Sequence, residues 1–127
     1  MNDFQRNNIR RQLLRALKLM GAATCAITRA DLDLNGMPTG ETHQVGSVYG
    51  VDYRQVSKSA ALLIDIPGVT INSDSAPRFI GVLLQGDAPK AGDMLDLSDG
   101  SRRIVSAADQ LGVLNLVLGG GAHERTL

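Results

Sequence analysis

The spacing of apolar residues changes at Gly21, and this change limits the folds that are open to the chain. Residues 3–20 contain no Gly or Pro and carry apolar side chains at helical spacing. From residue 22 onward the apolar or alternating runs are short, and turn residues such as Asn35-Gly36 and Asp99-Gly100 bound them. The sequence therefore predicts a mainly β protein with an N-terminal helix.

The segment 3–20 is expected to form an amphipathic helix. Asn2 or Asp3 can cap its first turn, and Gly21 can close its last turn. Because successive helical residues turn by about 100°, one face is apolar and consists of Ile9, Leu13, Leu17 and Met20. The opposite face is basic and consists of Arg11, Arg15 and Lys18.

This helix is also cationic. Asp3 is its one acid, and it stands against five bases: Arg6, Arg10, Arg11, Arg15 and Lys18. Five bases minus one acid give the segment +4, and since 13 bases and 13 acids cancel over the chain, the remainder carries −4. Arg6 and Arg10 continue the line of the apolar face, so we expect the first turns to extend beyond the body of the protein.

The remaining elements are expected to be strands. The apolar runs are 22–30, 44–56, 60–66, 78–85, 94–97, 102–107 and 113–118. In the clearest pair, residues 94–97 turn through Ser98-Asp99-Gly100-Ser101 into 102–105 as a hairpin. Aromatic residues make up only 3% of the chain, so the core has to be built from Leu, Val and Ile. These features indicate a small β-barrel or sandwich.

A chain of 127 residues has the size of a single domain. We divide it into a basic helix (3–20), a β body (22–118) and a flexible tail (119–127), with a long flexible loop over residues 55–75. This loop contains the apolar run Ala60-Ala61-Leu62-Leu63-Ile64. The run fits a buried strand and an interface segment equally well, because periodicity does not separate the two.

Composition and charge disfavour several classes of function. A net charge of zero disfavours a DNA-coating protein. No apolar run approaches 18 residues, so no transmembrane segment is expected. The sole cysteine in the sequence, Cys25, cannot form an internal disulfide or a cysteine-based zinc site, and no secretory leader is recognised. We expect a cytoplasmic protein with Cys25 in its core.

Asp31-x-Asp33-x-Asn35-Gly36 matches the opening of a calcium-binding loop. The twelfth position of such a loop requires a bidentate carboxylate, and Thr42 stands there. A strand-like segment also follows in place of a second helix. The sequence therefore favours a solvated hairpin tip over a calcium site.

No set of residues suggests catalysis. His43 and His123 lie far apart in the sequence, and neither has a partner at the spacing of a metal pair or of a nucleophile and its base. We therefore expect neither enzymatic activity nor a cofactor or metal.

The order of motifs in the second half resembles that of a known family. It runs through Val69-x-Ile71-x-Ser73, Ala76-Pro77, Phe79–Leu84, Pro89-Lys90-x-Gly92-Asp93, Leu95-x-Leu97-x-Asp99-Gly100, Ile104-Val105 and Gly112-Val113-Leu114-x-Leu116-x-Leu118. Upstream, Val48–Arg54 resembles the strand that precedes the family's long loop. Over residues 45–118 the chain thus resembles the small head-tail joining proteins of tailed bacteriophages. These include the lambda-type head-tail attachment protein and related connector or stopper proteins.

The chain also departs from this family. Arg103 precedes Ile104 in the second strand of the hairpin, where the family usually has an aromatic residue. The segment 55–75 is unusually apolar around residues 60–66. We expect the first difference to alter the packing of the hairpin and the second to mark a surface that is covered in an assembly.

The resemblance implies a virion structural protein that joins the DNA-filled head to the tail. The implied partners are portal or adaptor ring proteins, tail proteins and further copies of the chain in a ring, with no membrane; the helix is also compatible with non-specific contact to channel DNA. The implied locations are the virion and, during assembly, the host cytoplasm. The expected contact residues are Arg6, Arg10, Arg11, Arg15, Leu62, Leu63 and Ile64, although the basic helix fits a solvated face as well. The alternatives are a tail-completion or tail-tube subunit and, more distantly, a small β-barrel enzyme or a calcium-binding module.

Overall fold

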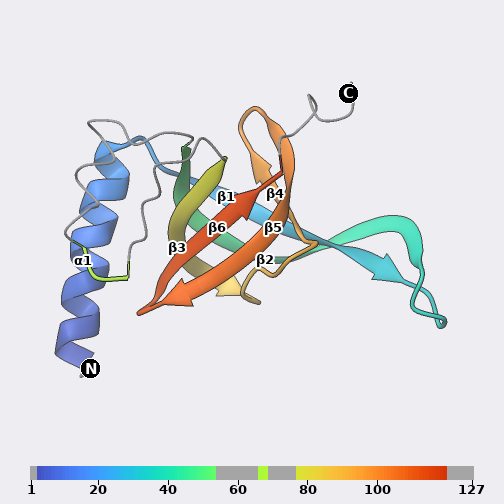
Figure 1. Ribbon diagram of the computed structural model, residues 1–127, viewed down its shortest axis with the longest axis horizontal. Coiled ribbons are helices and arrows are strands. Elements are labelled where there is room, and N and C mark those ends of the chain that lie inside the picture. The colour runs from blue at the N-terminus through green and yellow to red at the C-terminus, as the bar shows by residue number, and fades with distance from the viewer. Residues whose placement is uncertain (1–2, 54–65, 69–76, 120–127) are drawn as a thin grey trace.

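The computed structural model describes residues 3–53, 66–68 and 77–119 (Figure 1). Within these residues a helix, α1 (Asp3–Leu19), precedes six strands. The strands are β1 (Ala23–Leu32), β2 (Pro38–Tyr53), β3 (Arg78–Gly86), β4 (Met94–Leu97), β5 (Gly100–Gln110) and β6 (Val113–Leu118). The mainly β architecture with an N-terminal helix is therefore confirmed.

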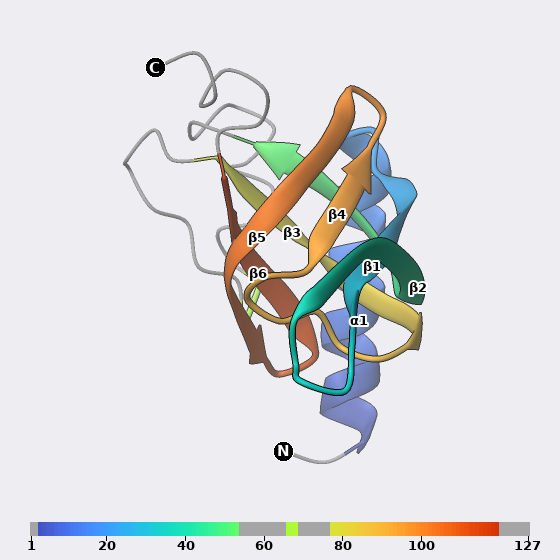
Figure 2. The same ribbon diagram turned by 90° about the vertical axis from the view of Figure 1, so that its right-hand side faces the viewer.

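The strands of the described residues form a closed barrel in the order β1-β2-β3-β6-β5-β4. All the pairings are antiparallel, and the barrel closes where Ile27 of β1 pairs with Leu95 of β4. Figure 2 shows the strands around the barrel axis, with α1 behind them. The fold is thus a barrel and not a sandwich.

The barrel interior is filled by aliphatic side chains around Phe79, whose exposed fraction is 1%. The interior residues are Cys25, Ile27, Val48, Leu95, Ile104, Leu114, Leu116 and Leu118. The position of Cys25 in the core is confirmed. Room for the Phe79 ring comes from Gly50, where an added Cβ would lie 2.6 Å from the ring carbon Cζ.

A second core lies between α1 and the outer face of the barrel. It contains Ile9, Leu13, Ala16 and Leu17 of the helix against Ile66, Ile80, Val82 and Val113. Alternate residues of β3 serve the two cores, since Phe79 points into the barrel while Ile80 packs in the cluster under the helix. The helix therefore covers one side of the barrel wall, as Figure 1 shows.

The helix ends at Leu19, one residue before the expected boundary. The amide of Gly21 donates to the carbonyl of Lys18, and the amide of Ala22 donates to the carbonyl of Leu17. These two bonds and the φ of +81° at Gly21 form a Schellman motif, which requires a left-handed residue at this point. Gly21 therefore closes the helix, as its sequence position predicts.

Most strands lie close to their expected positions, and β2 differs most. It begins at Pro38, six residues before the expected start at Gln44. The expected hairpin of residues 94–105 is confirmed, because β4 and β5 pair from Leu97↔Gly100 back to Met94↔Arg103. Of the expected strand 60–66, only Ile66 falls within the described residues. The loop 55–75 is otherwise described at residues 67 and 68 alone, and the tail at Gly119 alone.

Candidate interaction surfaces

The four arginines of the expected interface, Arg6, Arg10, Arg11 and Arg15, are all exposed on α1. The first buried side chain of the helix is Ile9, and Phe4 before it has an exposed fraction of 80%. In Figure 1 the N-terminal turns reach beyond the edge of the barrel. The helix thus exposes its basic residues to solvent, while its apolar face packs against the barrel.

The arginines divide between two surfaces. Arg6 and Arg10 line a groove between α1 and the turn that joins β5 to β6, with a volume of about 500 Å³. We call this hollow the helix groove; its other lining residues include Ile9, Leu13, Leu111 and Val113. Arg11 and Arg15 do not line this groove and lie on the exposed side of the helix. Arg6 and Arg10 thus lie beside the apolar face of the helix, as the sequence predicted.

The turn at the rim of the groove has an unusual backbone. It is a two-residue hairpin turn in which Leu111 has a φ of 58° and Gly112 has a φ of 85°. A left-handed conformation costs a residue with a Cβ about 1–2 kcal/mol. Leu111 nevertheless occupies this position with nearly half of its surface exposed. Asn or Gly would satisfy such a turn without this cost.

A two-stranded arm projects from the barrel on the side away from α1 (Figure 1). We define the arm as residues 30–43, where β1 and β2 continue to pair as far as Leu32↔Pro38. Large apolar side chains stand exposed at its tip: Leu32 at 60%, Leu34 at 105% and Met37 at 61%. The sequence predicted the hairpin tip but not the length of the arm, because residues 38–43 are polar and show no alternation that would indicate a strand.

The tip of the arm is a tight turn held by Asp33. Its Oδ1 accepts hydrogen bonds from the amides of Asn35 (2.8 Å) and Met37 (2.9 Å), and its carbonyl accepts from the amide of Gly36 (3.0 Å). Asp31 instead turns its carboxylate toward the Nδ1 atom of His43 across the arm. These contacts make the Asp31–Gly36 segment a hairpin tip, as the sequence favoured.

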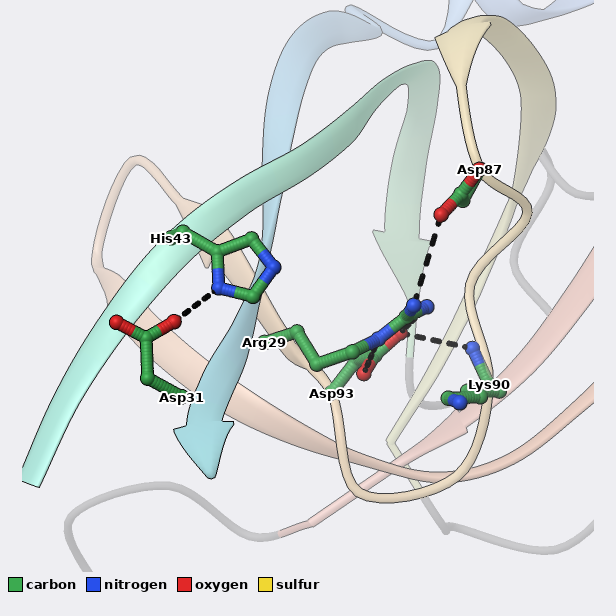
Figure 3. A network of polar contacts seen from close by, with 6 residues as sticks. All are labelled: Arg29, Asp31, His43, Asp87, Lys90 and Asp93. Carbon is green, nitrogen blue, oxygen red and sulfur yellow. Dashed lines mark hydrogen bonds and ion pairs between the residues drawn. The ribbon is translucent and has the colours of Figure 1, made fainter. Parts of the chain in front are cut away.

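At the root of the arm, Arg29 forms a bidentate ion pair with Asp93 (Figure 3). Arg29 Nε lies 2.9 Å from Asp93 Oδ1, and Nη2 lies 3.0 Å from Oδ2. The amide of Lys90 also donates to Oδ2 at 3.1 Å. Since Asp93 is only 1% exposed, this pair ties β1 to the connection between β3 and β4.

The electrostatics of Asp93 follow from these contacts. Burial alone would raise the pKa of its carboxyl, but the hydrogen bonds from Arg29 and Lys90 and their positive charges outweigh burial. The pKa of Asp93 is therefore held below its ordinary value of 3.8. The carboxylate stays ionised and paired near neutral pH.

Cys25 borders a smaller hollow of about 330 Å³, together with Asp52 and Asp96. Burial raises the pKa of the Cys25 thiol above its ordinary value, and the negative charges of the two aspartates raise it further. The thiol is consequently protonated near neutral pH, the form that is not nucleophilic.

Several other residues singled out from the sequence fall outside the described ranges. Leu62, Leu63 and Ile64 lie outside the described residues, as does His123. Within residues 3–53, 66–68 and 77–119, no cluster of His, Cys, Asp and Glu is suited to hold a metal ion. In the same ranges, no helix has the length and apolar character that a bilayer span requires.

Comparisons of the chain with protein-family models, with curated proteins and with solved structures give no significant match. Its function therefore has to be argued from its own residues and surfaces.

Proposed function

We propose that this chain is a virion structural protein of a tailed phage or prophage. In this role it connects the DNA-filled head to the tail, as one subunit of a ring between the portal or adaptor ring and the tail proteins. It acts in the virion and assembles there from the host cytoplasm. The proposal starts from the resemblance of residues 45–118 to the head-tail joining proteins and assigns their role to the whole chain.

The observation that carries this proposal is the placement of two projecting elements on a closed barrel. The cationic helix α1 covers one side of the barrel, and the apolar-tipped arm extends away from the other side (Figure 1). In the closed antiparallel barrel each strand pairs with two neighbours, so the barrel is a stiff body that holds its surfaces at a fixed separation. A connector subunit needs such a spacer with contact surfaces on different sides.

The exposed arginines suit the head-facing contact. Arg11 and Arg15 lie on the solvent side of α1, where guanidinium groups can pair with carboxylates or phosphates. The partner that we assign to this face is an acidic rim of the portal or adaptor ring. DNA in the channel is the second negatively charged partner that the face could contact. The apolar segment Leu62, Leu63 and Ile64 stays a predicted contact.

The test is a joining assay in vitro. Filled heads and free tails are prepared from cells in which the gene for this chain is disrupted, and the purified protein is added to heads first or to tails first. We expect the protein to bind heads and to restore tail attachment, counted by electron microscopy. Binding to tail tips or tubes without binding to filled heads would replace the connector role with that of a tail-completion or tail-tube subunit.

A further inference from the structure

We infer that the arm of one copy docks into the helix groove of a second copy of this chain, so that copies associate head to tail. The inference supplies the proposed connector with its subunit contact and rests on that function. It assigns a partner to two surfaces: the arm tip and the hollow between α1 and the β5–β6 turn.

The first argument is the match of apolar surface. Leu32, Leu34 and Met37 stand exposed together at the arm tip, and Leu34 has no protection from solvent. The helix groove has a buried apolar floor that includes Ile9 and Val113. Protein interfaces have an apolar centre and a polar rim. The arm has an exposed apolar tip on a polar shaft, and the groove has an apolar floor with a basic rim, so the two surfaces match as the two sides of one interface.

The second argument is charge. The arm contains three acids, Asp31, Asp33 and Glu41, and neither Lys nor Arg. Arg6 and Arg10 stand at the groove, and the carboxylate of Asp109 in its lining accepts a hydrogen bond from the amide of Gly112 at 3.0 Å. An acidic arm that enters a basic groove is electrostatically complementary, which favours this orientation over arm-to-arm or groove-to-groove contact.

The third argument is position. The arm and α1 lie at opposite ends of the long axis of the molecule (Figure 1), so the arm of a copy cannot fill its own groove. Contacts between two different patches are heterologous, and they build a ring where the rotation between copies closes and an open filament where it does not. A ring is the arrangement that a connector between two larger rings requires.

Leu111 adds a fourth argument. It keeps an exposed apolar side chain at the groove rim in a backbone conformation that Asn or Gly would adopt at lower cost. Docking of the arm would bury this side chain and explain its presence. Leu111→Asn should then weaken association without lowering the melting temperature of the monomer.

The experiment is sedimentation velocity at about 1 mM protein, which populates a self-association with a Kd as weak as 1 mM. We expect the wild-type chain to form species larger than a dimer. Leu34→Asn in the arm and Leu111→Asn in the groove should each weaken association by about tenfold or more. The matched control is Leu19→Asn, which changes an exposed leucine at the far end of α1 and should associate like wild type.

An equimolar mixture of Leu34→Asn and Leu111→Asn gives the sharpest result. The intact arm of one variant fits the intact groove of the other, so the mixture should form dimers and nothing larger. A wild-type chain that stays monomeric, a groove variant that associates like wild type, or a mixture that stays monomeric would each overturn the inference. If the arm and groove proved not to bind each other but the protein still joined heads to tails, the inferred interface would be wrong and the connector role would stand. If the copies associated through the arm and groove but the protein did not join heads to tails, the interface would stand and the connector role would be wrong.

Discussion

Arg29 and Asp93 stand 64 positions apart, and their side chains meet at the root of the arm (Figure 3). A buried ion pair adds little net stability when both partners are present, because desolvation offsets much of the attraction. Its geometry is nevertheless fixed by two parallel hydrogen bonds, which set the position of β1 against the β3–β4 connection. We therefore expect this pair to control the direction in which the arm leaves the barrel.

Asp93→Asn should lower the free energy of unfolding by about 2 kcal/mol, because the charge-assisted hydrogen bonds from Arg29 and Lys90 to the buried carboxylate are lost or weakened. Asp87→Asn is the matched control, since Asp87 contacts the same guanidinium at 3.6 Å but its side chain is 71% exposed. That control should change stability by no more than about 0.5 kcal/mol. Urea unfolding at neutral pH measures both, and equal effects of the two substitutions would contradict this assignment.

The same pair gives the expected pH dependence. Since the folded pKa of Asp93 lies below its ordinary value of 3.8, its ionisation stabilises the fold fully above that value. This contribution is lost as the pH falls from 3.8 through the lower folded pKa. The stability difference between wild type and Asp93→Asn should therefore shrink in acid, and a difference unchanged at about pH 2 would show that the carboxylate charge is not responsible.

In the sequence, Gly92-Asp93 stood out as one of the motifs of the resemblance, and nothing there gave Asp93 a partner. Local patterns describe neighbours along the chain, and no pattern joins Asp93 to Arg29. The backbone strain at Leu111 was equally hidden, because it depends on the two-residue length of the β5–β6 turn. Leu111-Gly112 does end in the glycine that such a turn favours, and that was the available signal.

Among the elements, α1 combines a structural face with a candidate binding face. Leu13 and Leu17 are fully buried on the side of the helix that packs against the barrel, while Arg11 and Arg15 lie on its exposed side. Substitutions on the exposed side should therefore change binding without changing the fold. This separation allows the helix to be tested by charge reversal.

Arg11→Glu combined with Arg15→Glu should abolish the joining of heads to tails and leave the melting temperature unchanged. The reason is that both side chains are exposed and the proposed partner is acidic, so reversal creates repulsion. Arg11→Lys with Arg15→Lys is the matched control and should retain most joining, because it keeps the charge. Normal joining by the Glu variant would mean that this face is merely solvated.

Helix and strands could be predicted to different degrees. Ile9, Leu13 and Leu17 recur at helical spacing, and Asp99-Gly100 marks a tight turn, so α1 and the β4–β5 hairpin were both predictable. The barrel and sandwich alternatives could not be separated, because closure depends on a pairing of Ile27 with Leu95, far away in the sequence. The tip of the arm was predictable from Asn35-Gly36, but its length was not, because both faces of a projecting hairpin meet solvent, which removes the alternation that reveals a strand.

The whole molecule is a barrel with different chemistry at its two ends. One end carries basic residues on α1, and the other carries an acidic arm with an apolar tip. The net charge of zero conceals this division, because the +4 of the helix is cancelled by the remainder of the chain. A polarised subunit of this kind fits a place between two different neighbours.

The location of the protein in assembled particles tests the connector proposal most directly. Val105→Cys places a reactive thiol at an exposed position on β5, whereas the native Cys25 is buried. Particles reconstituted with the gold-labelled variant would then be viewed by electron microscopy. The proposal predicts gold at the junction between head and tail; gold along the tail tube or at its far end, or joined particles without gold, would contradict it.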